Sequence, residues 1–539
     1  MKFPKILLLL AAAWTSIGQA EAPKRPKLVL AVLVDQFRYD YVERFHDQLV
    51  EGGLKRLTDQ GAFMTFARYD YFPTITAPGH ASYLSGTTPA SHGIIANDWY
   101  DKRTKKMTYC VSDPEVNGLG TNAPAGRMSP KNFIGPNFSD MMRMHYQSKV
   151  IGVSIKDRGA ILPAGKKPAG AYWFEPASGN FISSTYYRNE LPEWVQKFNE
   201  RHRAQEFVGQ KWDLLLDKKE YPWPDNAAGE GTLSGEKTVT FPHAVAAAKE
   251  GFANVIPTPF GNQLLVEFAE AALDGEQLGQ GPQPDVFTVS FSSIDYNGHR
   301  FGPYSREVQD MVLRFDRQLA ELFKYVDQKL GAGNVDIVLT ADHGVMPTPE
   351  FAAEQGLGGQ RVDPLDLVGD LMKKLEEHFG PGRYLQVPRL IEGNLYLNHD
   401  QLKEKNLSLA DVVSFIREWA FDTGKFQACY SREQLLDGRA PGAIGERVIK
   451  GYNAERSGDV VLIFKPYTIS WGATGTTHGS PYSYDTHIPI LFHGPSFRPG
   501  RYPDEFYITD IVPTLCAAMH IDEPAGSTGK PLGKILVNP

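Results

Sequence analysis

Three apolar runs constrain the fold of this chain more than any other feature. Residues 27–34, 285–291 and 334–341 are dominated by apolar side chains, many of them branched. Such runs are typical of strands that are buried on both faces of a parallel sheet. Residues 307–330, between the last two runs, have apolar side chains at helical spacing, which predicts a strand–helix–strand unit. We therefore expect an α/β fold with a mixed, mostly parallel central sheet that is flanked by helices.

Side chains that can bind metals follow each of these runs. Asp35 comes directly after the first run. Asp295 and His299 lie just past the second run, and Asp342 and His343 end the third. Ligands of open α/β sheets bind beyond the carboxyl ends of the strands, so we expect the five residues to converge at one edge. Taken alone, Asp35 fits a helix N-cap or a turn equally well.

A Pro-rich segment, residues 71–80, is suited to presenting a hydroxyl group. Pro73 and Pro78 lack backbone donors, so we expect a loop rather than a strand or helix interior, with a helix beginning near Ala81. That helix would place N–H groups beside Thr76, which favours an anion there. We take Thr76 as the candidate nucleophile, although a threonine hydroxyl must be activated by a base, a lowered pKa or a metal. An ordinary Pro/Gly loop is the alternative.

Three further polar side chains are candidate donors to an oxyanion. Asn97 offers two amide N–H groups. Lys156 and Arg158 follow an expected strand over residues 150–155. Alternate residues of an extended chain point the same way, so this pair would form a two-pronged cation. On its own, Asn97 also fits an ordinary turn, and the pair fits a solvated surface.

The candidates together suit two divalent cations. Those with carboxylate, imidazole or hydroxyl groups are Asp35, Thr76, Asp295, His299, Asp342, His343 and His478. Such a set can hold two ions about 3.5–4 Å apart, each with an open position for a substrate. Imidazole with carboxylate favours zinc, with manganese or iron as alternatives. The sequence has no Cys-x-x-Cys pair, which excludes a thiolate zinc site.

The net charge and the N-terminal residues limit which partners and which cellular location we expect for the protein. The net charge of −7, without a long basic run, argues against a nucleic acid polymer as partner. Lys2 and Lys5 precede an apolar stretch over residues 6–14, and small residues follow up to Ala20. We expect residues 1–20 to be a removed signal peptide, which predicts a periplasmic or secreted protein. The stretch is shorter than the ~20 residues of a membrane span, so we expect no transmembrane span in the mature chain, with a retained anchor as the alternative.

The remainder is expected to form a single catalytic unit. We assign residues 21–539 to one domain, with inserted cap segments near residues 166–258 and 345–470. The first segment is rich in aromatic residues, proline and charge without a clean period, and the second separates the third apolar run from the last strand. We expect the mature chain to be a monomer.

Seven segments, in this order, resemble the alkaline phosphatase superfamily. They are Val34–Arg38, Phe72–His80, His92–Asp101, Ser154–Arg158, Ile294–His299, Ala341–Gly344 and Gly475–His478. Each segment alone is weak evidence, but together they span nearly all of the mature chain. Within the superfamily the chain resembles the secreted alkaline phosphatases of the phosphate-irrepressible type, which use a threonine nucleophile. The resemblance implies an alkaline phosphatase-like fold.

The resemblance also implies the cofactors and the role of each site residue. It implies two Zn²⁺ ions, one held by Asp35, Asp342, His343 and the Thr76 oxygen, the other by Asp295, His299 and His478. His487, which also precedes the last strand, is the alternative final ligand. The implied reaction is metal-dependent hydrolysis of small-molecule phosphate monoesters through a phosphothreonine intermediate, which releases inorganic phosphate outside the cytoplasm.

Asn97, Lys156 and Arg158 would bind the nonbridging oxygens of the substrate and so bear on its class. A monoester dianion carries one more negative charge than a diester, so this cationic pair favours monoesters. A nucleotide pyrophosphatase or phosphodiesterase on the same fold is the main alternative. A sulfatase fits less well, because no cysteine occupies a loop like that of residue 76, and an exported binding protein without turnover is the third alternative.

Overall fold

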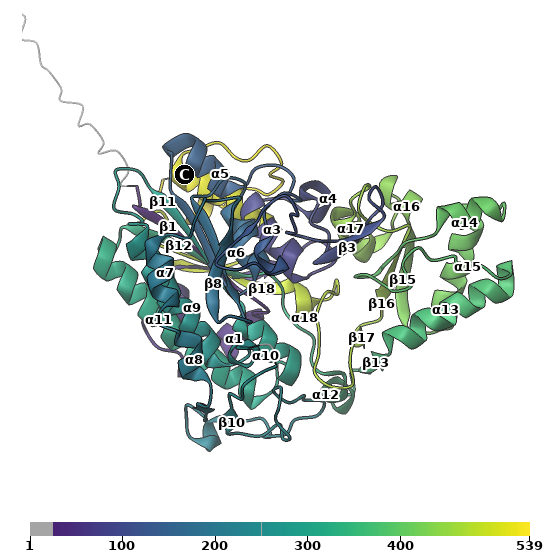
Figure 1. Cartoon of the computed structure of the whole chain (residues 1–539), viewed down its shortest axis with the longest axis horizontal. Helices are drawn as coiled ribbons and strands as arrows, with labels where there is room; N and C mark the ends of the chain where they lie inside the picture. The colour runs from purple at the N-terminus through teal and green to yellow at the C-terminus, as the bar shows by residue number, and fades with distance from the viewer. Residues whose placement is uncertain (1–24, 250, 539) are drawn as a thin grey trace, which may run out of the picture.

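The computed structural model of the protein describes residues 25–249 and 251–538, so the predicted signal peptide lies outside the described residues. The core is a ten-stranded sheet in the order β19-β2-β18-β12-β1-β11-β6-β7-β8-β5 (Figure 1). Its strands are β1 (Leu28–Val34), β2 (Ala62–Arg68), β5 (Gly118–Leu119), β6 (Val150–Ser154), β7 (Gly170–Glu175), β8 (Asn180–Ser184), β11 (Asp285–Phe291), β12 (Val335–Ala341), β18 (His487–His493) and β19 (Gly500–Tyr507).

The three apolar runs form the centre of this sheet. β1 pairs in parallel with β11 on one side and with β12 on the other, and β11, β6 and β7 continue the parallel set. Every residue of β1, β11 and β12 is buried, as expected for strands covered on both faces. β18 runs antiparallel to its neighbours β12 and β2. The predicted mixed, mostly parallel sheet is therefore confirmed.

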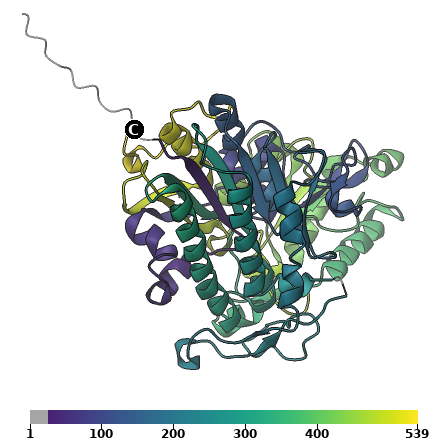
Figure 2. The same cartoon turned by 60° about the vertical axis from the view of Figure 1, so that its left-hand side comes forward.

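Helices cover both faces of the sheet. They include α3 (Thr76–Ser85), α5 (Phe138–Tyr146), α6 (Asp157–Ala164), α9 (Pro259–Gly275), α10 (Ser293–Phe301), α11 (Arg306–Leu330) and α19 (Ile511–Met519). α9, α10 and α11 pack together on one face, and α3, α5, α6 and α19 pack together on the other (Figures 1 and 2). α11 matches the predicted helix to within one residue.

The Pro-rich segment folds differently from the expectation. α3 begins at Thr76 rather than near Ala81, so Pro78 lies in its first turn. The first N–H groups of a helix have no intrahelical partner, and proline is tolerated there for that reason. At Gly79 a Cβ atom would collide with the backbone oxygen of Asp342, so the missing side chain lets α3 approach the end of β12.

The first predicted insertion contributes to the main sheet. Residues 170–184, at its start, form β7 and β8, with β8 antiparallel to β7. The later part forms α7 (Glu193–Asn199), α8 (Arg203–Phe207), β9 (Lys211–Trp212) and β10 (His243–Ala244). α7 and α8 pack against α9, on the face that α11 also covers.

The second predicted insertion builds a small lobe with its own core, at the right of Figure 1. A three-stranded sheet in the order β14-β16-β15 organises it. Its elements are α12 (Pro349–Glu354), β13 (Gln360–Val362), α13 (Pro364–Phe379), β14 (Asn394–Leu395), α14 (His399–Glu404), α15 (Leu409–Asp422), β15 (Phe426–Ser431), α16 (Arg432–Leu436), α17 (Gly442–Gly451), β16 (Val460–Phe464) and β17 (Thr468–Ser470). Its hydrophobic cluster includes Leu371, Leu375, Ile416 and Leu462, and is distinct from that of the main sheet.

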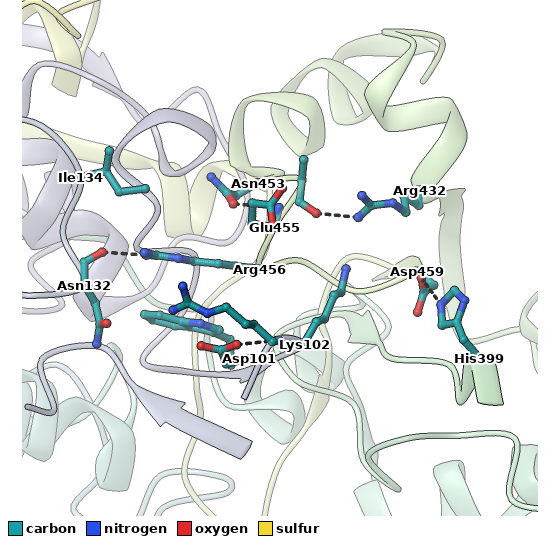
Figure 3. Close-up of a pocket in the computed structure, with 13 residues that line it drawn as sticks. Asp101, Lys102, Asn132, Ile134, His399, Arg432, Asn453, Glu455, Arg456 and Asp459 are labelled. Atoms are coloured by element: carbon teal, nitrogen blue, oxygen red, sulfur yellow. Dashed lines mark hydrogen bonds and ion pairs between the residues drawn. The ribbon is translucent and has the colours of Figure 1, made fainter. Parts of the chain in front are cut away.

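A polar cavity of about 550 Å³ lies between this lobe and the hairpin of β3 (Asp98–Asp101) and β4 (Lys106–Tyr109) (Figure 3). Arg456, from the lobe, reaches across to the main body. Its guanidinium donates to the backbone oxygens of Gly93 and Asn132 and lies over the ring of Trp99, 5.0 Å from the centroid. This side chain therefore fastens the lobe to the body.

The described residues contain no helix that is both long enough and apolar enough to cross a membrane. Cys110, Cys429 and Cys516 are buried and free.

Candidate active site

The predicted ligand residues meet at the carboxyl edge of the central strands. Three groups of side chains have ligand atoms within 4.8 Å of one another: Asp35, Asp295 and His343; Asp35, His80 and Asp342; Asp295, His299 and His478. We call Asp35, Asp342 and His343 the Asp35 cluster, and Asp295, His299 and His478 the Asp295 cluster. The clusters adjoin, because the rings of His343 and His478 stack with centroids 3.4 Å apart.

The Asp35 cluster is closed to solvent. Asp35, Asp342 and His343 have no exposed surface. The Nε2 atom of His343 lies 3.4 Å from a carboxylate oxygen of each aspartate. Burial, followed by the neighbouring Asp35 carboxylate, raises the pKa of Asp342 well above its usual value. Two buried acids held this close cannot both carry a negative charge unless a cation lies beside them, so without one the pair retains a proton.

The Asp295 cluster is more open. Its members come from α10 and from the loop before β18, and the side chain of His299 keeps 21% of its surface exposed. Asp295 Oδ1 lies 3.2 Å from His299 Nε2 and 3.6 Å from His478 Nε2. Burial, followed by nearby His343, lowers the pKa of His478 to about 3. This imidazole is therefore neutral at neutral pH, as a metal ligand must be.

The imidazole rings are oriented as ligands usually are. In His299, His343 and His478 the Nδ1 atom lies 2.8 to 3.0 Å from a backbone carbonyl oxygen. A ring that donates its Nδ1 proton to a carbonyl keeps the lone pair of Nε2, and all three Nε2 atoms face the carboxylates. One oxygen each of Asp35 and Asp342 is buried without a hydrogen-bond partner among the described residues. The donor set therefore fits divalent cations.

Thr76 stands beside the Asp35 cluster at the first residue of α3. Its Oγ1 lies 3.5 Å from His343 Nε2. Asn97 lies close by, since its Oδ1 accepts the N–H of Ala77 at 3.0 Å. The amide oxygen is thus engaged, and Nδ2 is the end that remains to donate to an oxyanion. The N-terminal N–H groups of α3 add partial positive charge beside the same hydroxyl.

Lys156 and Arg158 do not form the extended pair that we expected. β6 ends at Ser154, Lys156 is the N-cap of α6, and Arg158 lies in the first helical turn. Lys156 Nζ reaches inward, 2.6 Å from both Asp35 and Asp295, so it bridges the two clusters. Burial acts to lower the pKa of Lys156, but the two carboxylates outweigh it and raise the pKa.

Arg158 is held by neighbours of its own. Its Nη1 donates to the hydroxyl of Tyr109 at 3.0 Å, and that hydroxyl donates to Asp157 at 2.5 Å. Its Nε is buried without a partner among the described residues, so part of the guanidinium remains available to an anion. His487, the alternative ligand, lies elsewhere, stacked on Tyr39 with centroids 4.1 Å apart.

Sequence reasoning missed two residues of this site. The backbone N–H of Gln36 donates to Asp342 Oδ1 at 3.0 Å, and its side-chain Nε2 donates to Asp295 Oδ1 at 2.8 Å, so it connects the two clusters. Gln36 holds a φ of 60°, which is costly for a non-glycine residue. Its position directly after Asp35 was the only available signal. His80 lies 3.2 Å from Asp342, but both its nitrogens already face Thr76 O and Ser290 Oγ.

The chain is similar to known proteins over most of its length. The family model for type I phosphodiesterase / nucleotide pyrophosphatase matches residues 29–496. The alkaline phosphatase PafA of Elizabethkingia meningoseptica is 38% identical over 540 residues, 98% of each chain. The alkaline phosphatase PhoV of Synechococcus elongatus is 38% identical over 517 residues, 95% of this chain and 93% of PhoV.

Solved structures of PafA match closely as well. The wild-type crystal structure has a TM-score of 0.91 at 38% identity and covers 96% of this chain and 100% of its own. A second PafA structure, with a TM-score of 0.90, is of a variant in which a threonine, an asparagine, a lysine and an arginine are replaced. Because the family model and the full-length relatives cover most of the sequence, the chain belongs to the type I phosphodiesterase / nucleotide pyrophosphatase family of the alkaline phosphatase superfamily.

Proposed function

We propose that the protein is an alkaline phosphatase that hydrolyses phosphate monoesters with Thr76 as its nucleophile. The observation that carries this proposal is the position of the Thr76 hydroxyl. It lies at the N-terminus of α3, beside the Asp35 cluster, with Lys156 joining that cluster to the Asp295 cluster. The full-length relatives named alkaline phosphatases support the same activity.

The cofactors in this proposal are two divalent ions, with zinc favoured by the imidazole and carboxylate donors. The first would be held by Asp35, Asp342, His343 and the Thr76 oxygen, the second by Asp295, His299 and His478. When bound, such ions lower the pKa of a coordinated hydroxyl and offset the negative charge on a departing oxygen.

The chain's own side chains position the substrate and form the intermediate. Thr76 Oγ1 attacks phosphorus in line with the leaving oxygen and forms phosphothreonine, which water then cleaves to free the hydroxyl and inorganic phosphate. The Nδ2 of Asn97, the ammonium of Lys156 and the guanidinium of Arg158 would hold the nonbridging oxygens. The four residue types match those replaced in the PafA variant.

The alternative activity is that of a phosphodiesterase, which the name of the family model includes. A monoester dianion carries one more charge than a diester, and the buried Lys156 with Arg158 would stabilise it more. We expect a mononitrophenyl phosphate to be turned over much faster than a bis-nitrophenyl phosphate. The reverse preference would support the diesterase.

Export to the periplasm or beyond the cell is part of the proposal, and it rests on the charged and apolar pattern of residues 1–20. A monomeric mature chain is a separate part of the proposal. Secretion of the full-length chain with loss of this segment, and the mass of the purified protein in solution, test the two statements.

The decisive experiment compares Thr76→Ala with the wild type in phosphatase assays before chelation, after chelation and after zinc is returned. Loss of a covalent nucleophile should lower kcat/KM by several orders of magnitude, roughly 10³-fold or more. Thr104→Ala, at an exposed site in the β3–β4 turn, is the matched control and should retain activity. After chelation, zinc should restore the activity of the wild type and of Thr104→Ala but not that of Thr76→Ala. Full activity in Thr76→Ala would refute the nucleophile, and phosphate binding without alcohol release would support a binding protein instead.

A further inference from the structure

A second cavity borders the Asp295 cluster, and its chemistry differs from that of the phosphate site. It has a volume of about 230 Å³ and is lined in part by His478, one of the cluster's imidazoles. Beside polar residues, its lining includes a set of large apolar side chains, Phe72, Leu390, Leu462, Phe464, Ile469 and Trp471. We call these six residues the apolar wall. The small lobe supplies much of it, through β16, β17 and the residues beside them.

Trp471 ties this wall to the proposed metal ligands. Its indole ring stacks on the imidazole of His299, with centroids 5.2 Å apart and planes 16° from parallel. It is nevertheless 41% exposed, which is unusual for an aromatic side chain of this size. An exposed aromatic ring beside a catalytic cluster is well placed to cover part of a substrate.

The geometry of the displacement indicates which part of the substrate would lie in this cavity. In an in-line displacement the leaving oxygen departs on the side of phosphorus opposite the nucleophile. Thr76 lies beside the Asp35 cluster, so the leaving group would lie on the side of the Asp295 cluster. That side borders the cavity with the apolar wall, because His478 belongs both to the Asp295 cluster and to the lining of the cavity.

The charges of the lining residues also indicate which leaving groups the cavity would disfavour. No lysine or arginine is among the described residues that line this cavity. The two carboxylates in the lining of the cavity are those of Asp485 and Glu392. Asp485 accepts the N–H of Ser480 at 2.8 Å, and Glu392 lies at a backbone position with a φ of 45°. No lysine or arginine side chain in this lining would offset the charge of an anionic group, so burying one beside these carboxylates is costly. By contrast, the cavity of Figure 3 is lined by Lys102, Arg432 and Arg456.

We propose that the cavity with the apolar wall is the leaving-group subsite, and that it selects phosphate monoesters of uncharged, single-ring alcohols over those of anionic alcohols. This inference rests on the proposed function and deepens it. A cavity of roughly 150 Å³ is large enough to hold benzene, so the available volume accommodates one ring. Trp471 and Ile469 would contact the ring, and the carboxylate of Glu392, when ionised, would repel a negative charge.

The test compares three substrates with alcohols of similar acidity: methyl phosphate, benzyl phosphate and 4-carboxybenzyl phosphate. The wild-type holoenzyme should have a kcat/KM about 10- to 100-fold higher for benzyl than for methyl phosphate, from burial of the ring. It should disfavour the carboxybenzyl ester relative to the benzyl ester. Trp471→Ala and Ile469→Ala should each reduce the benzyl-to-methyl ratio several-fold. Glu392→Gln should raise the carboxybenzyl-to-benzyl ratio.

The benzyl-to-methyl ratio is the informative quantity, because a displaced His299 would lower kcat/KM for both esters together. Phe421→Ala, which removes a 51% exposed aromatic ring elsewhere on the lobe, is the matched control and should leave the ratios unchanged. A readout without turnover is the binding of benzylphosphonate and methylphosphonate, measured by calorimetry. The wild type should bind the benzyl compound more tightly, and Trp471→Ala should reduce that difference.

Failure of this inference and failure of the proposed function look different. A wild-type benzyl-to-methyl ratio near one, or ratios that no wall variant alters, would overturn the subsite while phosphatase activity persists. If no monoester is hydrolysed at all, the proposed function fails. The phosphonate titrations then decide the subsite independently, and equal binding of the two phosphonates would overturn it.

Discussion

Buried aspartates stand at both edges of the central parallel strands, but they meet different partners. At the amino edge, Asp285 accepts the backbone N–H groups of Lys149 and Gly279 at 2.8 and 2.9 Å. At the carboxyl edge, Asp35 and Asp342 face other ionisable side chains, and each keeps one buried oxygen unpaired among the described residues. Carboxylates that accept backbone donors stabilise the fold, whereas carboxylates crowded together require a cation. The groups that the aspartates contact, rather than the burial of the aspartates, distinguish the functional carboxyl edge from the amino edge.

One aspartate at each edge can be replaced by asparagine, and the replacement at the carboxyl edge should have the greater effect on activity. Asp342→Asn should lower kcat/KM for a monoester by about 10³-fold or more, because it removes a proposed metal ligand. The free energy of unfolding of the metal-free protein should not fall, because the raised pKa of Asp342 already favours the neutral acid there and the amide is neutral as well. Steady-state kinetics and urea denaturation measure the two quantities.

Asp285→Asn is the counterpart at the amino edge. An amide oxygen can replace only one of the two acceptors, so the free energy of unfolding should fall by about 1–3 kcal/mol. Activity per folded molecule should stay within about twofold, because the residue lies at the far end of β11. A folded but inactive Asp285→Asn protein would break the comparison between the edges.

Two histidines, one shortly before β18 and one at its first residue, distinguish a proposed metal ligand from a packed ring at the carboxyl edge. His478→Ala should lose about 10²-fold in activity and hold less zinc, because His478 belongs to the Asp295 cluster. His487→Ala should keep both, since that ring packs against Tyr39. Metal analysis of the purified variants, beside kinetics, is the measurement. Equal zinc content in the two variants would speak against His478 as a ligand.

Gln36 tests whether the two clusters must be connected. Gln36→Ala removes the side-chain donor to Asp295, and loss of such support typically costs about 10- to 100-fold in metal affinity or activity. Gln147 also has a positive φ, 56°, but caps α5 away from the clusters. Gln147→Ala is therefore the matched control and should keep its zinc affinity. Equal loss in both variants would mean that backbone strain, not the connection, matters.

The last expected effect is a gradual pH dependence of stability at the amino edge. Burial raises the pKa of Asp336 to about 6, above the 3.8 usual for an aspartate. The folded chain therefore holds this proton more tightly than the unfolded chain, so stability should fall as pH rises from about 4 to about 6 and then level off. The loss is up to about 3 kcal/mol. Urea denaturation at both ends of this range should show a flatter dependence for Asp336→Asn, and an unchanged slope would contradict the assignment.

The central sheet and the edge at which the site lies could be predicted from the amino-acid pattern alone. Apolar runs such as 27–34 can be buried only in the middle of a layered fold, and a parallel arrangement brings all their carboxyl ends to one edge. Asp35, Asp295 and Asp342 could therefore be assigned to one location before any coordinates were known. Their positions in the structure agree with that assignment.

The directions of the side chains around that edge, by contrast, depend on how distant segments pack together. A local pattern cannot show that Lys156 turns inward, because the cause is the field of Asp35 and Asp295, which are distant in the sequence. It also cannot show that Gln36 joins the clusters or that Trp471, in the segment after β17, stacks on His299. Periodicity reports which face of an element is buried, whereas contacts between distant segments depend on how those elements pack.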